Sequence, residues 1–243
     1  MKILEGHRAV VIGACGGVGR EVSKSLTDAG ATIAVVDLEK APVNELAKNL
    51  GGNGYALDAT DPNAFASFVE DLTSKQGMPS IVVNVLGLWH SSDYSKLSDA
   101  DWLKIISVNL TSVFHSARYF LPAMQAAKYG SMINFASTAG EYGSIRPAAH
   151  YAAAKGGVIA LTKSLAREVS PDGVRVNAIS PGPLLTDMLQ RRDEAELAEI
   201  AKRTLIGRLG TPRDMADAVL FLASPASTWV TGEILRVNGG ALI

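Results

Sequence analysis

Short runs of β-branched and other apolar residues recur along the whole chain. Runs of this length and composition are typical of strands buried inside a sheet. They predict strands at Ala9–Ile12, Thr32–Val36, Ile81–Val85, Met132–Phe135, Val174–Ile179 and Ile234–Val237, with a further short strand at Tyr55–Leu57.

The segments between these runs are long enough for helices and carry apolar residues three or four positions apart. Two such sets are Val22, Leu26 and Ala29, and then Phe65, Phe68, Val69 and Leu72. Alternating strands and helices predict an α/β fold with right-handed crossovers. We therefore expect a single Rossmann-type, doubly wound parallel sheet with helices on both faces, as one domain over residues 1–243.

The most polar region, residues 190–203, follows a Pro-Gly-Pro turn and is rich in Arg, Asp and Glu. We expect it to belong to an excursion above the sheet, near residues 184–205. It is either a solvated surface helix or a lid over a substrate, because charge-rich helical faces are common. Leu184, Leu185 and Met188 indicate an apolar pocket beneath it.

Composition narrows the class of partner. The chain has 23 Lys and Arg against 24 Asp and Glu, so it has no excess positive charge for nucleic acid or an anionic membrane surface. Its single cysteine, Cys15, cannot form an internal disulfide, and no secretory signal or bilayer-length apolar run is visible. We expect a soluble cytoplasmic protein that acts on a small molecule.

A glycine-rich turn, Gly13-Ala14-Cys15-Gly16-Gly17-Val18-Gly19, follows the first predicted strand and precedes a predicted helix. Glycines let a backbone approach a pyrophosphate, and the helix N-terminus stabilises its charge. We therefore expect Gly13, Gly17, Val18 and Gly19 to contact a dinucleotide. The spacing Gly-x-x-x-Gly-x-Gly differs from the commoner Gly-x-Gly-x-x-Gly, so a packing turn without a ligand is the alternative.

Asp37 ends the second predicted strand, twenty residues after Gly17, where a ribose-binding acid is expected. A carboxylate there accepts hydrogen bonds from ribose hydroxyls and repels the 2′-phosphate of NADP. NAD is therefore the predicted cofactor, although Arg20 and Lys40 keep NADP as an alternative. Asp58, at the end of the third strand, either contacts the adenine or only begins a turn.

Tyr151 and Lys155 are four residues apart in a predicted helix and share one face of it. A free tyrosine has a pKa near 10, and a neighbouring ammonium stabilises its phenolate. We expect Lys155 to lower the pKa of Tyr151 by about two. The pair alone is a weak signal, because Tyr-x-x-x-Lys also arises by chance on helices.

Ser137 follows the strand Met132–Phe135, at the edge of the sheet where ligands bind in this architecture. Its hydroxyl is suited to hold a substrate oxygen. The glycine turn, the acidic strand end, the strand-end serine and Tyr-x-x-x-Lys, in this order, resemble the short-chain dehydrogenase/reductase superfamily. The resemblance covers the whole chain and extends to Val108-Asn109, Asn177-Ala178-Ile179-Ser180-Pro181-Gly182 with Thr186, and Thr231-Gly232-Glu233 with Val237-Asn238-Gly239-Gly240.

This resemblance implies a catalytic tetrad of Asn109, Ser137, Tyr151 and Lys155. Asn109 would help to hold a proton-relay water below Lys155, which would also bond the nicotinamide ribose. Ile179 would lie against the nicotinamide ring. Further cofactor contacts are implied for Asn84, Gly87, Pro181, Gly182 and Thr186. By the same resemblance the protein is a homotetramer.

Two positions depart from the family pattern. Ile12 stands where the family usually has Thr, and Asn84-Val85-Leu86-Gly87 stands where it usually has Asn-Asn-Ala-Gly. The loss of the second Asn removes a hydrogen bond that supports the sheet, and Leu86 enlarges the wall beside the adenosine ribose. Cofactor affinity is the property that these changes affect.

The favoured function is that of a NAD-dependent alcohol dehydrogenase or ketoreductase, which moves a hydride between nicotinamide and a small secondary alcohol or its ketone. One alternative is a 3-oxoacyl-carrier-protein reductase, which normally uses NADPH and is disfavoured by Asp37. The other is a dinucleotide-sensing protein that has kept the fold without the chemistry.

Several residues near the predicted site allow two interpretations. Trp89, His90 and the pair Glu141-Tyr142 either shape a substrate pocket or pack on the surface. His150 adjoins Tyr151, but helix neighbours lie about 100° apart, so we expect it to point away and pack.

Cys15 lies near a predicted helix N-terminus, which lowers the pKa of a thiol. Filling the glycine turn is its favoured role all the same. The histidines and Cys15 show no zinc-binding spacing, so we expect no metal.

Overall fold

The computed structural model describes residues 2–185 and 193–241, and within them the central element is a parallel sheet of seven strands. The strand order is β3-β2-β1-β4-β5-β6-β7. The strands are β1 (Arg8–Ile12), β2 (Thr32–Asp37), β3 (Asn53–Ala56), β4 (Ile81–Asn84), β5 (Gly130–Phe135), β6 (Val174–Pro181) and β7 (Ile234–Val237). The predicted doubly wound sheet is confirmed, and each expected strand is present to within two residues at either end.

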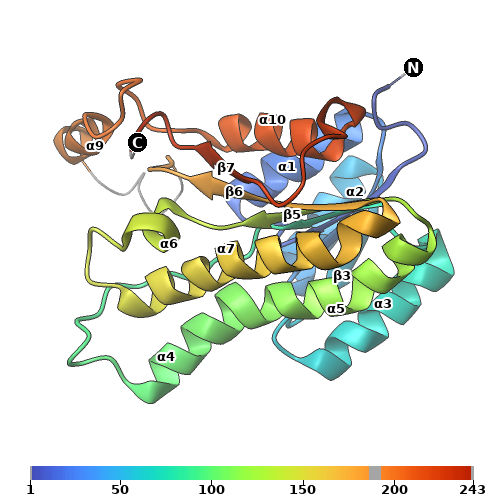
Figure 1. Ribbon diagram of the computed structural model, residues 1–243, viewed down its shortest axis with the longest axis horizontal. Helices are drawn as coiled ribbons and strands as arrows, with labels where there is room; N and C mark the ends of the chain where they lie inside the picture. The colour runs from blue at the N-terminus through green and yellow to red at the C-terminus, as the bar shows by residue number, and fades with distance from the viewer. Residues whose placement is uncertain (1, 186–192, 242–243) are drawn as a thin grey trace.

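The order of the strands reverses between β1 and β4. The chain adds β2 and β3 on one side of β1 and then β4 to β7 on the other side. In open α/β sheets ligands bind at such a switch point, outside the carboxyl ends of the strands. The helix α6 (Thr138–Tyr142) begins directly after β5 and marks that end, and α9 (Glu194–Ala201) lies at the same end of the molecule (Figure 1).

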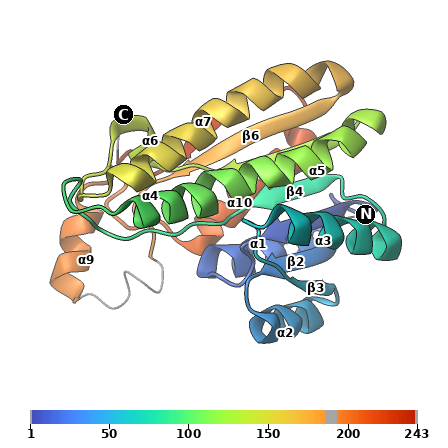
Figure 2. The same ribbon diagram turned by 90° about the horizontal axis from the view of Figure 1, so that it is seen from below.

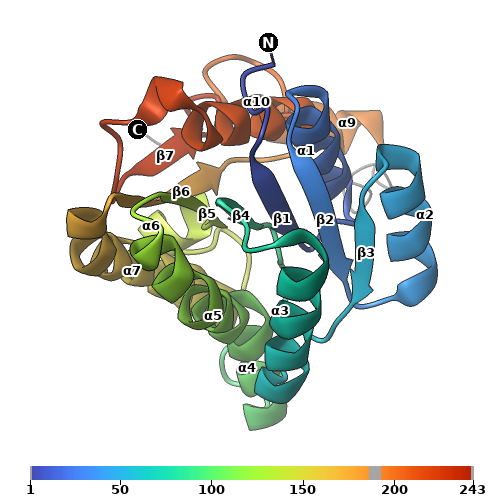
Figure 3. The ribbon, with the colours of Figure 1, turned by 90° about the vertical axis from the view of Figure 1, so that its right-hand side faces the viewer.

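Helices cover both faces of the sheet (Figure 3). One face is covered by α1 (Gly17–Asp28), α2 (Lys40–Leu50) and α10 (Pro212–Ala223). The other is covered by α3 (Pro62–Gln76), α5 (Ser112–Ala126) and α7 (Ala149–Val169). Successive side chains of a strand point to opposite faces, so in β1 Ala9 and Val11 join the first core while Val10 and Ile12 join the second.

The helix starts follow signals in the sequence. The carboxylate of Asp61 accepts hydrogen bonds from two N–H groups in the first turn of α3, and Pro62 fits the first helical position. Thr211 and Asp214 form a capping box at the start of α10. By contrast, α1 begins after Gly16 with no side-chain cap, so its first N–H groups have no side-chain partner.

A π-helical turn joins two consecutive helices. It is η1 (Ser107–Thr111), between α4 (Asp99–Ile106) and α5, and the three form one long rod beside α7 (Figure 2). Such turns occur frequently at functional sites. Two short 3-10 turns, η2 (Ser170–Asp172) and η3 (Pro225–Ser227), follow α7 and α10 respectively.

The polar region forms a helix in its described part. Asp193 caps α9, and its Oδ1 accepts a hydrogen bond from the N–H of Glu196 at 2.7 Å. Residues 190–192 lie outside the described residues. None of the helices in the described ranges combines the length and hydropathy needed to cross a membrane.

Candidate active site

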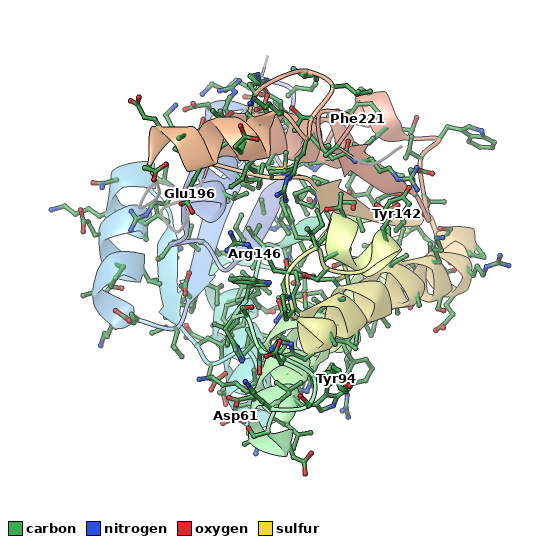
Figure 4. The ribbon with its side chains drawn as sticks, turned by 90° about the vertical axis from the view of Figure 1, so that its left-hand side faces the viewer. Asp61, Tyr94, Tyr142, Arg146, Glu196 and Phe221 are labelled. Atoms are coloured by element: carbon green, nitrogen blue, oxygen red, sulfur yellow. The ribbon has the colours of Figure 1, made fainter. Side chains whose placement is uncertain are left out.

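A cavity of about 440 Å³ opens at the carboxyl end of the sheet. Its walls include the residues that follow β4, β5 and β6, together with the start of α7 and the end of α9. Figure 4 views this end of the molecule and shows Arg146 near its middle. Of the predicted site residues, the cavity is lined by Val18, Gly87, Ser137, Tyr151, Lys155, Pro181 and Gly182.

Ser137 and Tyr151 reach the cavity from different elements. Ser137 follows β5 and caps α6, where its Oγ accepts a hydrogen bond from the N–H of Ala139 at 3.1 Å. Tyr151 stands in the first turn of α7. Burial raises the pKa of the Tyr151 phenol, and a hydrogen bond with Ser137 opposes that rise. The two hydroxyls therefore meet at one point of the cavity wall.

Lys155 lies one turn after Tyr151 and is only 2% exposed. Its Nζ donates to the carbonyl oxygen of Phe135 at 2.7 Å and to that of Leu86 at 3.3 Å. Burial lowers the pKa of the Lys155 ammonium to about 7.

The expected lowering of the Tyr151 pKa by Lys155 is wrong for this structure. Lys155 Nζ lies 5.8 Å from the centroid of the Tyr151 ring and is bonded to main-chain oxygens. Burial dominates both groups: it favours the neutral phenol and the neutral amine, so the pKa of Tyr151 rises and that of Lys155 falls.

Asn109 lies in the π-helical turn and is fully buried. Its Nδ2 donates to the carbonyl oxygens of Leu88 at 2.9 Å and Ile105 at 3.0 Å, and its Oδ1 accepts from the N–H of Leu88 at 3.2 Å. These bonds fix the segment after β4 against the α4–α5 rod. The role of Asn109 in holding a relay water stays a prediction.

Asn84 lies inside the sheet rather than in the cavity wall, which differs from the predicted cofactor contact. It is 1% exposed, and its Nδ2 donates to Asn134 Oδ1 at 2.8 Å, while Asn134 Nδ2 donates to Thr162 Oγ1 at 3.0 Å. This chain of amides joins β4, β5 and α7. Ile179 is also fully buried, in the core beneath α1 and α10, so it does not face the cavity as expected.

The glycine turn has the shape of a phosphate cradle. Gly13 has a φ of 90°, and an added Cβ would lie 2.9 Å from the backbone N of Leu86. A Cβ on Gly19 would lie 2.2 Å from the carbonyl oxygen of Gly13, whereas one on Gly17 would meet only Pro212 at 3.9 Å. Packing therefore requires Gly13 and Gly19, while Gly17 leaves space before the uncapped N-terminus of α1. This geometry fits a dinucleotide pyrophosphate.

Asp37 lies beside this turn at the end of β2. Its Oδ2 accepts from the N–H of Cys15 and its Oδ1 from the N–H of Leu38, both at 2.8 Å. Arg20 is at the same turn, because its Nε donates to the carbonyl oxygen of Cys15 at 2.8 Å. Burial and the Asp37 carboxylate raise the pKa of the Cys15 thiol, which corrects the lowering expected at a helix N-terminus.

Asp58 forms a turn. Its Oδ1 accepts from the N–H of Thr60 at 2.9 Å and from Thr60 Oγ1 at 2.7 Å. Its contact with adenine stays a prediction. Thr186, predicted to contact the nicotinamide carboxamide, and Met188 lie outside the described residues.

Trp89 and Glu141 differ in their position relative to the cavity. Trp89 lines the cavity, whereas Glu141 faces away from it. Glu141 accepts from Ser180 Oγ at 2.6 Å and from Arg236 Nε at 2.7 Å, which ties α6 to β6 and β7. Burial acts to raise the pKa of Glu141, but the bonds from Arg236 and Ser180 lower it overall.

His150 packs, as expected, but its partner was not predicted. It is fully buried, and its ring lies edge to face with that of His90, with centroids 4.6 Å apart. Burial and the nearby His90 lower the pKa of His150, so it is neutral at pH 7. This contact holds the segment after β4 against the start of α7.

Arg146, Ile200 and Arg203 line the cavity and were not predicted as site residues. Arg146 lies in the connection between α6 and α7, and the other two belong to the end of α9 and the residues after it. The other residues of α9 are mostly exposed. The polar region was expected to be either a solvated surface helix or a lid over a substrate. In its described part α9 is solvated on one side and adjoins the cavity on the other, so it has features of both.

Comparison with known proteins places the chain among oxidoreductases. Residues 13–241 match the family described as "Enoyl-(Acyl carrier protein) reductase". The chain is 37% identical over 239 residues to a 3-oxoacyl-[acyl-carrier-protein] reductase FabG of Vibrio harveyi, covering 98% of each protein. It is 36% identical over 251 residues to an uncharacterized short-chain type dehydrogenase/reductase of Sinorhizobium fredii, covering 99% of each.

A solved structure is also similar. The crystal structure of a 3-oxoacyl-[acyl-carrier protein] reductase from Brucella melitensis superposes with a TM-score of 0.92 at 32% identity, covering 98% of this chain and 92% of that one.

Gly17→Ala should leave the fold intact and weaken dinucleotide binding about tenfold or more, because the methyl group would occupy the space before the helix N-terminus. Fluorescence titration with NADH measures the binding. Gly19→Ala is the contrasting variant: its methyl group overlaps Gly13, so it should destabilise the free protein by about 1–3 kcal/mol. Unchanged NADH affinity in Gly17→Ala would show that the phosphates bind elsewhere.

Lys155→Met should flatten the pH dependence of stability between pH 7 and about 10. The pKa of Lys155 is about 7 in the folded chain and 10.5 when unperturbed, so in this window the unfolded chain binds more protons. The free energy of unfolding of the parent therefore rises with pH by up to about 1.4 kcal/mol per pH unit. Below pH 7 the destabilisation caused by burying the Lys155 ammonium is fully present. Urea unfolding of both proteins across the window measures the difference. If the difference in unfolding free energy between the two proteins did not change with pH, the lowered pKa of Lys155 would be contradicted.

Proposed function

Since the chain belongs to the short-chain dehydrogenase/reductase superfamily, we propose that it is a ketoreductase that converts 3-oxoacyl compounds to 3-hydroxyacyl compounds with NADH. Members of this superfamily are oxidoreductases that bind a nicotinamide dinucleotide. The observation that carries the proposal is the convergence of Ser137, Tyr151 and Lys155 on one cavity next to the glycine turn. The names of the relatives favour a 3-oxoacyl substrate over the small secondary alcohol that the sequence alone favoured.

In this proposal Ser137 and Tyr151 hold the carbonyl oxygen of the substrate, and Tyr151 gives that oxygen its proton. A bound NADH would supply the hydride that the carbonyl carbon accepts and would itself be oxidised to NAD⁺. Burial raises the pKa of the Tyr151 phenol, so the phenol retains the proton that it would donate to the substrate oxygen. Lys155 is positioned behind it by the carbonyl oxygen of Phe135.

The residues that would hold the dinucleotide are the glycine turn, Asp37 and the Pro181-Gly182 segment. Asp37 supports NADH over NADPH, because two backbone N–H groups fix its carboxylate beside the turn. A 2′-phosphate at that position would meet a negative charge at short range. Arg20 is the group that would moderate the repulsion, and it is already bonded to the Cys15 carbonyl.

The direct test follows the loss of NADH with 3-oxoacyl thioesters, the corresponding free acids, and simple ketones. Turnover confined to simple ketones would replace the proposal with the small-alcohol activity. Tight dinucleotide binding without turnover of any carbonyl compound would favour a sensing protein.

Tyr151→Phe should lower kcat by about 10²–10⁴-fold, because it keeps the ring and removes the transferable proton. NADH affinity should change little, since the glycine turn and Asp37 are untouched. Steady-state kinetics and an NADH titration on the same preparation separate the two effects. If this variant retained more than about a tenth of the parent turnover, Tyr151 would not be the proton donor.

The parent should use NADH about tenfold or more better than NADPH in kcat/KM, and Asp37→Ala should narrow that ratio. Loss of the carboxylate removes the repulsion of the 2′-phosphate and the hydrogen bonds to the ribose. Glu45→Ala is a control, because it removes an exposed carboxylate from α2 and leaves Asp37 in place. Preference for NADPH in the parent would overturn the role of Asp37.

A further inference from the structure

Three side chains that line the candidate active-site cavity are basic, and none of the described lining residues is acidic. Lys155 is buried at the bottom of the cavity, where it lies behind Tyr151 and bonds the carbonyl oxygen of Phe135. Arg146 and Arg203 are exposed. The cavity therefore presents two guanidinium groups to its solvent side that the proton transfer does not use.

The two arginines come from separate segments of the chain. Arg146 lies in the connection between α6 and α7, five residues before Tyr151, and Arg203 follows α9. In Figure 4 Arg146 lies at the centre of the view, between α9 and the start of α7. The fold thus brings both cations to the cavity that contains the reacting hydroxyls.

Some exposed arginines outside the cavity form ion pairs, whereas others, such as Arg167, form none within the described residues. Arg208 bonds Asp214 at 2.7 Å, and Arg236 bonds Glu141 at 2.6 Å. Within residues 2–185 and 193–241, neither Arg146 nor Arg203 forms a close ion pair, although Arg203 is near enough to the Glu199 carboxylate to help lower its pKa.

Like charges at one cavity repel each other, and an anion between them removes that repulsion. The planar guanidinium presents its N–H groups in a fork that matches a carboxylate or a phosphate. An anionic substrate group would therefore supply the charge that the described wall lacks.

The rest of the wall limits the size of that substrate. Trp89, Ile145, Leu184 and Ile200 give the cavity apolar surface suited to a short carbon chain. Val18, Pro181 and Gly182, which the proposal assigns to the cofactor, line the same cavity of about 440 Å³, so a bound nicotinamide would leave the substrate only part of it. A limited space of this kind fits a short oxo acid better than a long pantetheine arm.

We infer that the substrate is a short oxo acid whose carboxylate binds Arg146 and Arg203 while its ketone faces Ser137 and Tyr151. This inference rests on the proposed ketone reduction and names its substrate class. Arg146 and Arg203 are then specificity-determining residues, which act on binding and leave the proton transfer to Tyr151.

The test compares 3-oxohexanoate with its methyl ester and with 3-oxohexanoyl-CoA. The acid should exceed the ester about tenfold or more in kcat/KM. Arg146→Gln and Arg203→Gln should each lower kcat/KM for the acid about tenfold through KM, with kcat within about twofold and the ester unaffected. The preference for the acid should also weaken at high salt, because the pair is at the solvent side of the cavity.

Arg167→Gln is the matched control. Arg167 is an exposed arginine on α7, about 24 Å along the helix from Tyr151, and its loss should change none of these values. Equal use of acid and ester, or arginine variants that affect both alike, would overturn the inference and leave ketone reduction standing. A preference for the CoA ester that the arginine variants abolish would assign the two residues to a phosphate and would also overturn it.

A binding measurement separates this inference from the proposed function. Tyr151→Phe saturated with NADH is titrated calorimetrically with 3-oxohexanoate, with and without Arg203→Gln. Binding that depends on Arg203 would support the anion site. If the parent protein at the same time turned over no ketone, the proposed reduction would be wrong while the anion site would stand. Absence of binding, or binding that Arg203→Gln leaves unchanged, would defeat the anion site.

Discussion

The Nζ of Lys155 is held at the bottom of the cavity by two main-chain carbonyl oxygens, those of Phe135 and Leu86. Phe135 ends β5 and Leu86 follows β4, so one side chain from α7 joins the helix to two neighbouring strand ends. The same burial lowers the pKa of Lys155 to about 7 and raises that of the Tyr151 phenol. The Lys155 bonds fix the position of the helix, and burial at this same place favours the neutral form of both side chains.

Around this point the segment after β4 is fixed from several sides. Asn109 bonds both polar groups of the Leu88 backbone, and His150 packs against His90. Leu86 itself lies against Gly13, where no side chain fits. The segment between the glycine turn and the cavity is thus held by the π-helical turn, α7 and the glycine turn together, which fixes this part of the cavity wall.

Charge is distributed unevenly between the two ends of the site. Asp37 stands at the ribose end of the glycine turn, and Arg146 and Arg203 stand at the substrate end. In our proposal the carboxylate selects the cofactor that lacks a 2′-phosphate, and the guanidinium groups select a substrate that carries an anion. The proton transfer between them uses groups that burial keeps close to neutral.

Much of the site was predictable because its signals are local. A strand followed by a glycine turn and a helix start predicted a phosphate-binding turn, and the position of Ser137 after β5 predicted its place at the edge of the sheet. The motif did not show the orientation of Asn84 and Ile179, because it assigns a residue to a site without showing which way its side chain points. Asn84 turns into the sheet toward Asn134, and Ile179 turns into the core.

The sequence by itself determined the parallel sheet, the order of its elements and the position of Ser137 at the carboxyl end of a strand, because periodicity and spacing are properties of neighbouring residues. Only the tertiary structure decided the pKa directions of Tyr151 and Lys155, the pairing of His90 with His150, and the presence of Arg146 and Arg203 in the wall of one cavity. Each of these depends on burial or charge contributed by segments distant in the chain, and that information is absent from any local pattern.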